Sequence, residues 1–262
     1  MSPAVVRDVE IQRTLKDSSL GLRAHEAPNS SSPLKFDLVS SALQLEKEDM
    51  DACIDLVEST SSHDYKASSI GWNPRRKRAE MTDREMIYLL VRQGDVDAGT
   101  EHKRRDDAGT TDQATPQIDT SSAAIDNTES VTVSKECIQN KCEANNRSER
   151  PHSSSILGFI SFMFTNDDPP HDDREVVYIY EIHLREHLRG RGLGSNLIQF
   201  VEEVATRCGV TKTMLTVFTA NRGARTMYEK LGYGRDECSP KDRVTRRKVI
   251  EAEYVIMSKE LR

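Results

Sequence analysis

A short run of arginines and glycines is the segment of this chain best suited to bind an anion. It is Arg189-Gly190-Arg191-Gly192-Leu193-Gly194-Ser195, and it joins an apolar segment to an amphipathic one. Glycine permits backbone conformations that turn successive N–H groups toward one point, and a helix that begins there adds the positive end of its dipole. The run therefore predicts a pyrophosphate site. Taken alone, a tight turn that only needs glycine explains it equally well.

Two common phosphate-binding motifs do not fit this run. A Rossmann dinucleotide fingerprint would need a third glycine where Leu197 stands, and a strand earlier in the chain. A P-loop would need Gly-Lys followed by Ser or Thr, and the run lacks that sequence.

The periodicity of apolar residues predicts the elements that must position the run. Helices are expected over 42–59, 195–208 and 221–231. Strands are expected over 86–91, 156–164, 175–184, 213–218 and 254–258. Thr82 resembles a helix N-cap, with Glu85 as the capping-box acid. Strands that alternate with helices predict an α/β domain with a mixed sheet.

Composition divides the 262 residues into parts. Residues 94–155 contain no Phe, Trp or Tyr and carry seven basic against twelve acidic groups, so they cannot bury enough apolar surface to offset chain entropy. We expect a disordered acidic insertion there, with a short hairpin near 131–138 as an alternative. Residues 1–33 predict a flexible leader, and the range 34–262, interrupted by the insertion, predicts a single domain.

Charge and hydropathy exclude several classes of protein. Apolar residues make up 36% of the chain, and no run approaches the ~18 apolar residues of a membrane span. The N-terminus has no long apolar stretch, so we expect no secretory signal. The five cysteines form no CxxC pair, which favours a reducing compartment. A net charge of -6 argues against a general nucleic-acid binder.

Three further patterns favour simpler interpretations. The stretch 183–187 matches the H-x-x-E-H zinc-peptidase pattern, but it spans a strand end and a glycine run instead of one helix, so we expect no metal site. The basic run Arg75-Arg76-Lys77-Arg78 fits a nuclear import signal or a histone-tail clamp, and a solvated helix face explains it as well. The run 246–248 predicts a basic loop.

Two motifs resemble the cofactor-binding motifs of the GNAT acetyltransferase superfamily. Arg189-x-x-Gly192-x-Gly194 looks like its acetyl-CoA pyrophosphate loop, and the stretch from Asn221 to Tyr233 looks like its second cofactor motif. A closer resemblance is to the NatD family of N-terminal α-amino acetyltransferases. The segments that carry it are 71–73, 80–83 with 88–89, 178–182, 214–218 and 254–258.

The resemblance implies a GNAT fold, acetyl-CoA as co-substrate and a set of catalytic residues. Backbone at Ile182, His183 and Leu184 would pair with pantetheine, residues 189–195 would hold the pyrophosphate, and Asn221 would complete the site. Glu181 would be the general base, acting through water on an α-amine whose pKa is ~7.7–8.0; an outward-facing strand carboxylate is the alternative. Tyr180 and Tyr228 fall on catalytic positions, and the role of Tyr228 as general acid stays open.

The NatD family acetylates the tails of histones four and 2A, which begin Ser-Gly-Arg-Gly. The residues expected to bind such a tail are Tyr88, Tyr178, Tyr180, Thr216 and Tyr254. Asp167 and Asp168, with Asp172 and Asp173 nearby, lie in the turn where the family places acids that bind the substrate arginine. Packing of the tyrosines and a solvated acidic turn are the alternatives.

The resemblance thus implies a histone N-terminal acetyltransferase of the nucleus and cytoplasm. We expect a monomer without an auxiliary subunit, with no direct contact to nucleic acid or membrane. Cys53, Cys208 and Cys238 fall outside the expected site, which argues against a thiol nucleophile. Two alternatives stay open: a GNAT enzyme for lysine or small amines, and a catalytically silent module that binds acetyl-CoA or histones.

Overall fold

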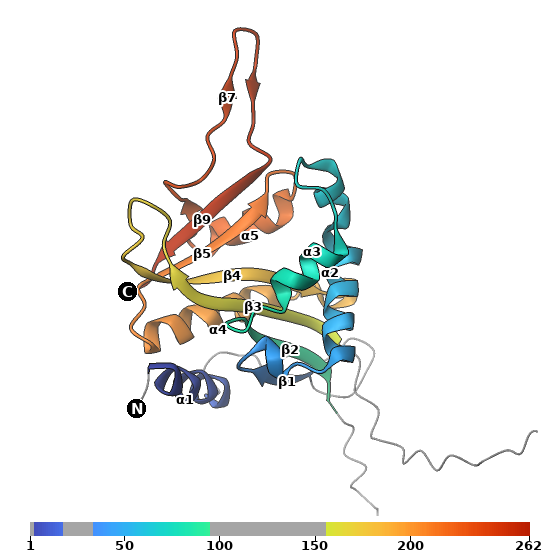
Figure 1. The fold of residues 1–262 in the computed structure, drawn as a ribbon, viewed down its shortest axis with the longest axis vertical. Coiled ribbons are helices and arrows are strands. Elements are labelled where there is room, and N and C mark those ends of the chain that lie inside the picture. The colour runs from blue at the N-terminus through green and yellow to red at the C-terminus, as the bar shows by residue number, and fades with distance from the viewer. Residues whose placement is uncertain (1–2, 18–33, 95–155) are drawn as a thin grey trace, which may run out of the picture. The chain divides into compact units, whose positions relative to one another are not determined.

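A mixed sheet of seven strands forms the centre of the fold (Figure 1). The computed structural model describes residues 3–17, 34–94 and 156–262, which belong to one compact unit. Most of the predicted insertion 94–155, with the hairpin near 131–138, lies outside the described residues. Among the described residues, no helix is long and apolar enough to cross a membrane.

The strands follow the order β1-β2-β3-β4-β5-β9-β6 across the sheet. Their bounds are β1 Leu34–Val39, β2 Ile87–Gln93, β3 Ile156–Asn166, β4 Glu175–Leu184, β5 Lys212–Phe218, β6 Gly234–Arg235 and β9 Tyr254–Glu260. Neighbours are antiparallel except β4 and β5, which are parallel. The predicted mixed α/β class and the five predicted strands are therefore confirmed.

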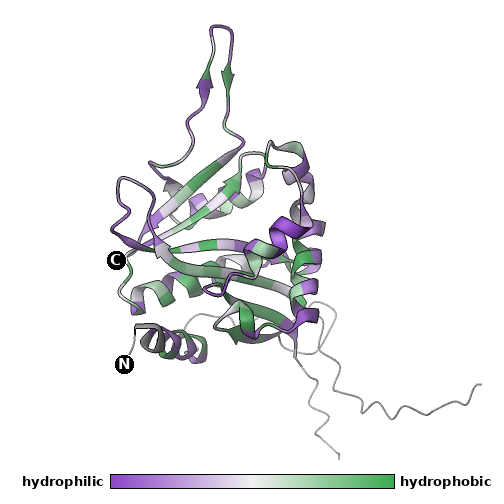
Figure 2. Cartoon of the chain, in the orientation of Figure 1, coloured by the Kyte–Doolittle hydropathy of each residue, from purple (hydrophilic) through white to green (hydrophobic). Residues whose placement is uncertain are grey.

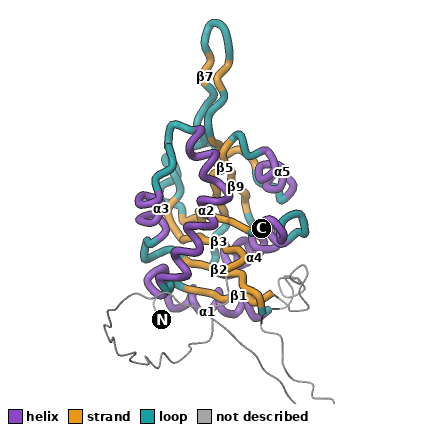
Figure 3. The backbone as a smooth tube through the Cα atoms, turned by 90° about the vertical axis from the view of Figure 1, so that its right-hand side faces the viewer, coloured by secondary structure: helices purple, strands orange, loops and turns teal. Residues whose placement is uncertain are grey.

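Helices cover both faces of the sheet (Figure 3). One face packs against α4 (Leu193–Arg207), α5 (Arg222–Lys230) and α1 (Pro3–Lys16). The other packs against α2 (Lys47–Ala67) and α3 (Pro74–Met81). Side chains alternate along a strand, and β1, β2, β3 and β4 contribute to both cores, whereas β5 and β9 contribute to the first. In Figure 2 the strands are largely apolar whereas α3 is strongly hydrophilic. Only Lys77 and Met81 of α3 are buried.

The N-terminal segment corrects one prediction. Residues 3–16 form α1, so a flexible leader over 1–33 is wrong for this part. The helix docks by burying Ile11 and Thr14, and Arg7 pairs with Glu175 of β4 at 2.5 Å. These contacts are tertiary, and the apolar residues of the segment follow no clear helical period in the sequence.

Two local predictions also differ from the structure. The helix expected over 42–59 begins later and ends later, because residues 42–44 form a separate 3-10 turn and the polar residues after position 59 stay helical. Thr82 ends α3 instead of starting a helix: its N–H and its hydroxyl both bond to the Arg78 carbonyl at 2.9 Å.

The remaining elements are short. A 3-10 turn, Glu186–Leu188, connects β4 to the glycine run. Strands β7 (Arg243–Val244) and β8 (Val249–Ile250) form a separate hairpin, and the basic run 246–248 lies at its exposed turn.

Candidate active site

The two parallel strands in the middle of the sheet part at one point. β4 and β5 pair at Val177–Thr213, Tyr178–Met214 and Ile179–Leu215, and the pairing ends there although both strands continue. On its other side β4 has a bulge, because Ser161 pairs with Glu181 and Phe162 with Ile179, which leaves Tyr180 without a partner on β3. A bulge bends the strand and redirects its side chains.

The bulge turns several polar side chains to the same face. Tyr180 packs against the core under α2 and α3, and Glu181 contacts Lys77 of α3. His183 contacts Thr60 of α2. Two consecutive residues, 180 and 181, thus face the same helices, which strict alternation along a strand would not allow.

A hollow of about 690 Å³ lies beside the end of β4 and is called here the cofactor-side hollow. The predicted cofactor residues that line it are Ile182, His183, Leu184, Arg189, Gly190, Gly192, Gly194, Ser195 and Asn221. Arg191 and Leu193 do not line it; Leu193 is buried in the core, because the first turn of α4 points it inward.

Local geometry explains why glycines stand in this loop. Gly190 and Gly192 have φ of 72° and 84°, the left-handed region that other residues resist. A Cβ at either position would touch nothing, so conformation and not space requires glycine. Gly192 is the N-cap of α4, and Asn221 caps α5 by accepting a bond from the N–H of Ala224 at 3.1 Å. Two helix N-termini therefore border the hollow.

A second hollow, of about 510 Å³, lies on the α3 side and is called the peptide-side hollow. The predicted residues that line it are Asp168, Tyr178, Tyr180, Glu181, Thr216, Tyr228 and Tyr254. The hydroxyls of Tyr178 and Thr216 lie 2.5 Å apart and link β4 to β5. The two hollows share the lining residues Ser61, Ile182, His183, Asn221 and Tyr228, so they meet where β4 and β5 part.

Glu181 lies beside this junction, and each of its two carboxylate oxygens has a polar partner. Its side chain is only 8% exposed, and its two oxygens contact Lys77 Nζ at 2.7 Å and His183 Nε2 at 2.6 Å. Burial alone would raise the pKa of Glu181, but the bond from His183 and the ammonium of Lys77 outweigh burial and lower it. For Lys77, burial would lower the pKa, and Glu181 and Tyr65 raise it instead.

Tyr228 is a further ionisable group at the junction. It is buried, and burial together with the charge of Glu181 raises the pKa of its phenol. The phenol therefore keeps its proton at neutral pH and has it available to donate.

Two predicted substrate residues lie outside the peptide-side hollow. Tyr88 is fully buried, and its hydroxyl donates to the Met81 carbonyl at 2.5 Å, so it anchors the end of α3. Asp167 is buried against Lys212 at 2.8 Å, and Lys212 also pairs with Asp236. Both side chains satisfy structural contacts, which sequence spacing alone does not reveal.

The sequence interpretation missed several lining residues from α2 and α3. Lys77 is the main one, and the others are Thr60, Ser61, Tyr65, Arg76 and Glu80. Lys77 and Arg76 belong to the basic run 75–78, which the sequence left open as a nuclear import signal, a histone-tail clamp or a solvated helix face. A signal for its burial existed, because Lys77 and Met81 are four residues apart and share one face of α3.

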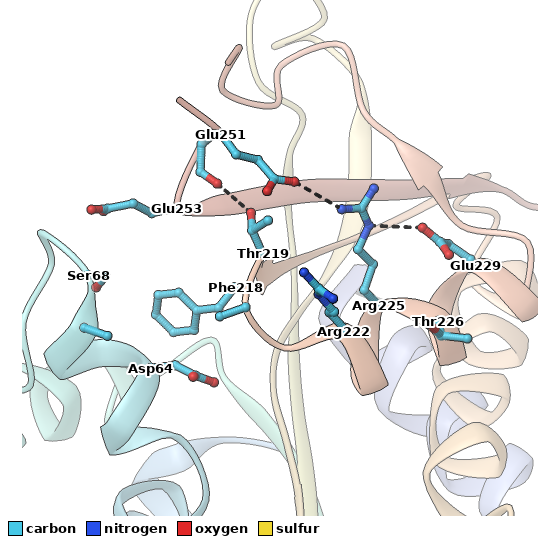
Figure 4. A pocket seen from close by; sticks show the side chains of 13 residues that line it. Asp64, Ser68, Phe218, Thr219, Arg222, Arg225, Thr226, Glu229, Glu251 and Glu253 are labelled. Carbon is cyan, nitrogen blue, oxygen red and sulfur yellow. Dashed lines mark hydrogen bonds and ion pairs between the residues drawn. The ribbon is translucent and has the colours of Figure 1, made fainter. Parts of the chain in front are cut away.

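A third hollow, of about 540 Å³, lies between the end of α2, the start of α5 and residues 251–253 (Figure 4). Arg225 pairs there with Glu229 at 3.0 Å and Glu251 at 3.9 Å. Phe218 also lines the peptide-side hollow, and its ring packs edge-on against Tyr65. None of the predicted site residues lines this hollow, so the junction is the better candidate site.

The H-x-x-E-H pattern does not form a zinc site of the peptidase kind. His183 belongs to β4 and is buried, whereas His187 belongs to the following 3-10 turn and is exposed. The part of the chain that the structure describes holds no cluster of three or more metal-ligating side chains.

Residues 127–233 match the family model described as acetyltransferase (GNAT) family. This range includes β3, β4, α4, β5 and α5, which supply most of the cofactor-side hollow. The match and the mixed sheet confirm the predicted GNAT fold.

Similar proteins match over part of the chain. N-alpha-acetyltransferase 40 of Saccharomyces cerevisiae is 35% identical over 105 residues, which cover 33% of this chain and 36% of that protein. Thialysine N-epsilon-acetyltransferase of Bos taurus is 36% identical over 56 residues, or 21% of this chain and 33% of that one. The chain spans less than half the length of the curated relatives it matches.

Solved structures align over most of the described fold at low identity. The structure of Arabidopsis thaliana NAA60 in complex with a bisubstrate analogue is 10% identical, with a TM-score of 0.47. The alignment covers 87% of this chain and 100% of that one. A likeness of this size carries no information about substrates.

Proposed function

We propose that this chain, a mixed α/β domain of GNAT fold, is an N-terminal α-amino acetyltransferase that transfers acetyl from acetyl-CoA. The observation that carries the proposal is the junction of two hollows where β4 and β5 part. The glycine loop and two helix N-termini border one hollow, and tyrosines with Glu181 line the other. A thioester in the first hollow can therefore face an amine in the second.

The cofactor-side hollow fits a diphosphate. The N-terminal turns of α4 and α5, with the positive ends of their dipoles, favour phosphate oxygens, and Arg189 adds a positive charge. We propose that Ile182, His183 and Leu184 line the pantetheine arm. Acetyl-CoA supplies an activated acetyl group as a thioester, and the proposed reaction needs no metal.

The peptide-side hollow suits a free N-terminus with a basic residue close behind it. Tyr178, Tyr180 and Tyr254 provide aromatic walls. Asp168 lines the hollow and forms no ion pair with any described residue, so its carboxylate can accept a guanidinium. We propose that the substrates are the tails of histones four and 2A, which begin Ser-Gly-Arg-Gly. The partial identity to a yeast N-alpha-acetyltransferase supports this choice.

The chemistry needs a proton removed from the amine and one delivered to the leaving sulfur. We propose that the carboxylate of Glu181, with the side chains bonded to it, assists removal of the amine proton, and that the phenol of Tyr228 supplies a proton to the sulfur. Removal of acid–base assistance lowers rates by ~10²–10⁴-fold. Glu181→Gln should reduce turnover in that range and leave coenzyme A binding intact.

A second candidate function is acetylation of a lysine side chain or small amine. The partial likeness to thialysine N-epsilon-acetyltransferase favours it. A third candidate, a silent module that binds acetyl-CoA or histones, predicts binding without turnover.

A peptide comparison separates these candidates. Wild-type protein and acetyl-CoA would be incubated with Ser-Gly-Arg-Gly-Lys peptides whose α-amine is free or formylated, and the site of acetylation mapped by mass spectrometry. We expect acetylation of the free α-amine only, and a loss of about tenfold or more in kcat/KM when arginine at position three becomes alanine. Modification of the formylated peptide at lysine would contradict the α-amine proposal, and binding of acetyl-CoA without product would support the silent module.

We further propose that the protein acts as a monomer without an auxiliary subunit, in the nucleus and the cytoplasm, where histones are met. Sedimentation of the active protein tests the first point, and fractionation of cells that carry a tagged chain tests the second. A stable dimer, or exclusion from both compartments, would contradict them.

A further inference from the structure

Five polar side chains form a continuous row from the peptide-side hollow to the cofactor-side hollow. Glu80 contacts Lys77 at 2.8 Å, Lys77 contacts Glu181 at 2.7 Å, Glu181 contacts His183 at 2.6 Å, and His183 Nδ1 contacts Thr60 Oγ1 at 2.6 Å. Glu80 lines only the first hollow, Thr60 lines only the second, and His183 lines both. The row thus crosses the point where amine and thioester would meet.

Glu181 is poorly matched to take the proton itself. Its contacts with His183 and Lys77 hold its pKa below the ordinary value of a carboxyl group. A general base works best when its pKa lies near the working pH, and an α-amine has a pKa of ~7.7–8.0. Imidazole, with an ordinary pKa of ~6.5, is the side chain whose ordinary titration lies nearest to neutral pH.

The hydrogen bonds of His183 accommodate both protonation states of its ring. In the neutral ring, Nε2–H donates to Glu181 and Nδ1 accepts from the Thr60 hydroxyl. After protonation, Nδ1–H donates to Thr60 Oγ1, and the hydroxyl turns its hydrogen to the Leu56 carbonyl 2.7 Å away. Proton uptake therefore breaks neither contact of the ring.

We propose that His183 receives the proton of the amine through the Thr60 hydroxyl, and that Glu181 and Lys77 are the positioning pair that holds the ring. This inference rests on the proposed function. The amine nitrogen forms a bond to the acetyl carbon as the carbon–sulfur bond breaks, with its electron pair left on sulfur. One N–H proton passes to Thr60 Oγ1 while the hydrogen of Thr60 passes to His183 Nδ1. The thiolate takes the phenol proton of Tyr228, and the proton on His183 returns to Tyr228 through solvent.

The arrangement of hydroxyl, imidazole and carboxylate follows a general pattern of base activation. A carboxylate bound to one ring nitrogen fixes the tautomer and stabilises the imidazolium that forms on the other side. Here Lys77 in turn keeps Glu181 ionised, so the carboxylate does not take the proton from the ring. The ring of Phe159 packs against His183 from β3, with 5.5 Å between centroids, and limits its rotation.

Charged and titratable groups from several elements face this ring and its carboxylate partner. They are Glu181 on β4, Lys77 and Glu80 on α3, Tyr65 on α2, Tyr88 on β2 and Tyr228 on α5. The pKa of each of the three phenols is raised, so the phenols stay neutral across the pH range of the experiment. Lys77, Glu181 and Glu80 then give the surroundings of the neutral His183 ring a net charge of -1. Protonation of the ring brings the total charge of these four side chains to zero.

The test compares how kcat/KM depends on pH in wild type and in His183→Gln. Glutamine keeps polar contacts but cannot take up a proton. The assay is acetylation of a Ser-Gly-Arg-Gly peptide between pH 6.5 and 9.5. We expect kcat/KM about 100-fold below wild type at pH 6.5 and less than about fivefold below it at pH 9.5, where hydroxide from solvent can take the amine proton in place of the ring. Thr60→Val should show the same convergence, and Thr60→Ser should restore the rate. His63→Gln, on the exposed side of α2, is the matched control and should match wild type.

The outcomes are distinguishable. A loss of equal size at every pH would assign His183 a structural role and would overturn the proposed proton relay, the transfer from the amine through Thr60 to His183. A wild-type rate in His183→Gln or in Thr60→Val would overturn the relay as well. Coenzyme A affinity, measured in parallel, should be unchanged in every variant; a coenzyme A affinity lowered in step with the rate would also overturn the relay. A wild-type protein that binds coenzyme A but acetylates no α-amine would instead overturn the proposed function, and the relay with it.

Discussion

Lys77 and Glu181 form a buried ion pair whose two members come from different elements, α3 and β4. Their side chains are 6% and 8% exposed, and Lys77 also lies over the ring of Tyr65 at 5.0 Å. Desolvation of two charges is costly, so such a pair is retained for the geometry it fixes and not for stability alone. In this protein it fixes the orientation of Glu181 at the junction of the two hollows.

Replacement of Lys77 by Met leaves Glu181 buried without its cation. Loss of one partner of a buried pair costs about 3–5 kcal/mol, so we expect the free energy of unfolding in urea to fall by about 3 kcal/mol. Arg75→Met, on the exposed side of the same helix, is the control and should stay within about 0.5 kcal/mol of wild type. Equal unfolding midpoints for the two variants would contradict the structural role given to the pair.

Asp236 gives the stability a predictable pH dependence. Burial would raise its pKa, but bonds with Cys238 and Lys212 lower it below the ordinary value. A carboxyl with a lowered native pKa stabilises the fold above the pKa of the unfolded chain, ~3.9, and loses that contribution as the pH falls further. In urea titrations we expect Asp236→Asn to destabilise most at pH 7 and progressively less below pH 4. If the loss in free energy of unfolding of Asp236→Asn grew toward low pH, this assignment would be contradicted. Asp172 is exposed, and Asp172→Asn is the control, which should show no such trend.

At the level of elements, the role of the glycine loop before α4 in binding coenzyme A can be tested against a second glycine of similar conformation. Gly192 and Gly209 have φ of 84° and 79°, and a Cβ on either would touch nothing. Alanine at either position therefore costs the same left-handed strain, roughly 1–2 kcal/mol. Only Gly192 borders the cofactor-side hollow. We expect Gly192→Ala to weaken coenzyme A binding about tenfold by calorimetry and Gly209→Ala to leave it unchanged; equal affinities would argue against the loop as the diphosphate site.

The elements that the sequence predicted best are those whose apolar pattern is complete. Strands β3 and β5 bury nearly continuous apolar runs, α4 buries residues at a period of 3.6, and β4 alternates over much of its length, so their positions follow from the sequence. The bulge at Tyr180 breaks that period by one residue and depends on pairing with a distant strand. For the same reason the sequence did not indicate that Glu181 and Tyr180 share a face.

The parts of the site that escaped prediction belong to polar elements. Helix α3 buries one lysine and one methionine, so its docking depends on an ion pair with β4 and not on an apolar stripe. Tyr88 and Asp167 resembled site residues by position, yet both satisfy buried contacts. The sequence predicts which residue types are near the site, and tertiary contacts decide which of them reach the hollows.

At the scale of the whole molecule, the site joins segments that are far apart in the sequence. Ser61 comes from α2, and Ile182 and His183 from β4. Asn221 is the N-cap of α5, and Tyr228 lies in its last turn. All five line both hollows. The account therefore depends on one claim: the two hollows form a continuous path that brings an α-amine to a thioester.

The most direct measurement of this claim uses two conjugates of coenzyme A. One joins its sulfur through an acetyl bridge to the α-amine of a Ser-Gly-Arg-Gly peptide, and the other joins it to a lysine side chain of an N-terminally blocked peptide. Calorimetry should give the first conjugate a Kd at least about 100-fold below that of coenzyme A. The second conjugate should bind no more tightly than coenzyme A. Equal affinity of coenzyme A and the first conjugate, or tighter binding of the second, would contradict the account.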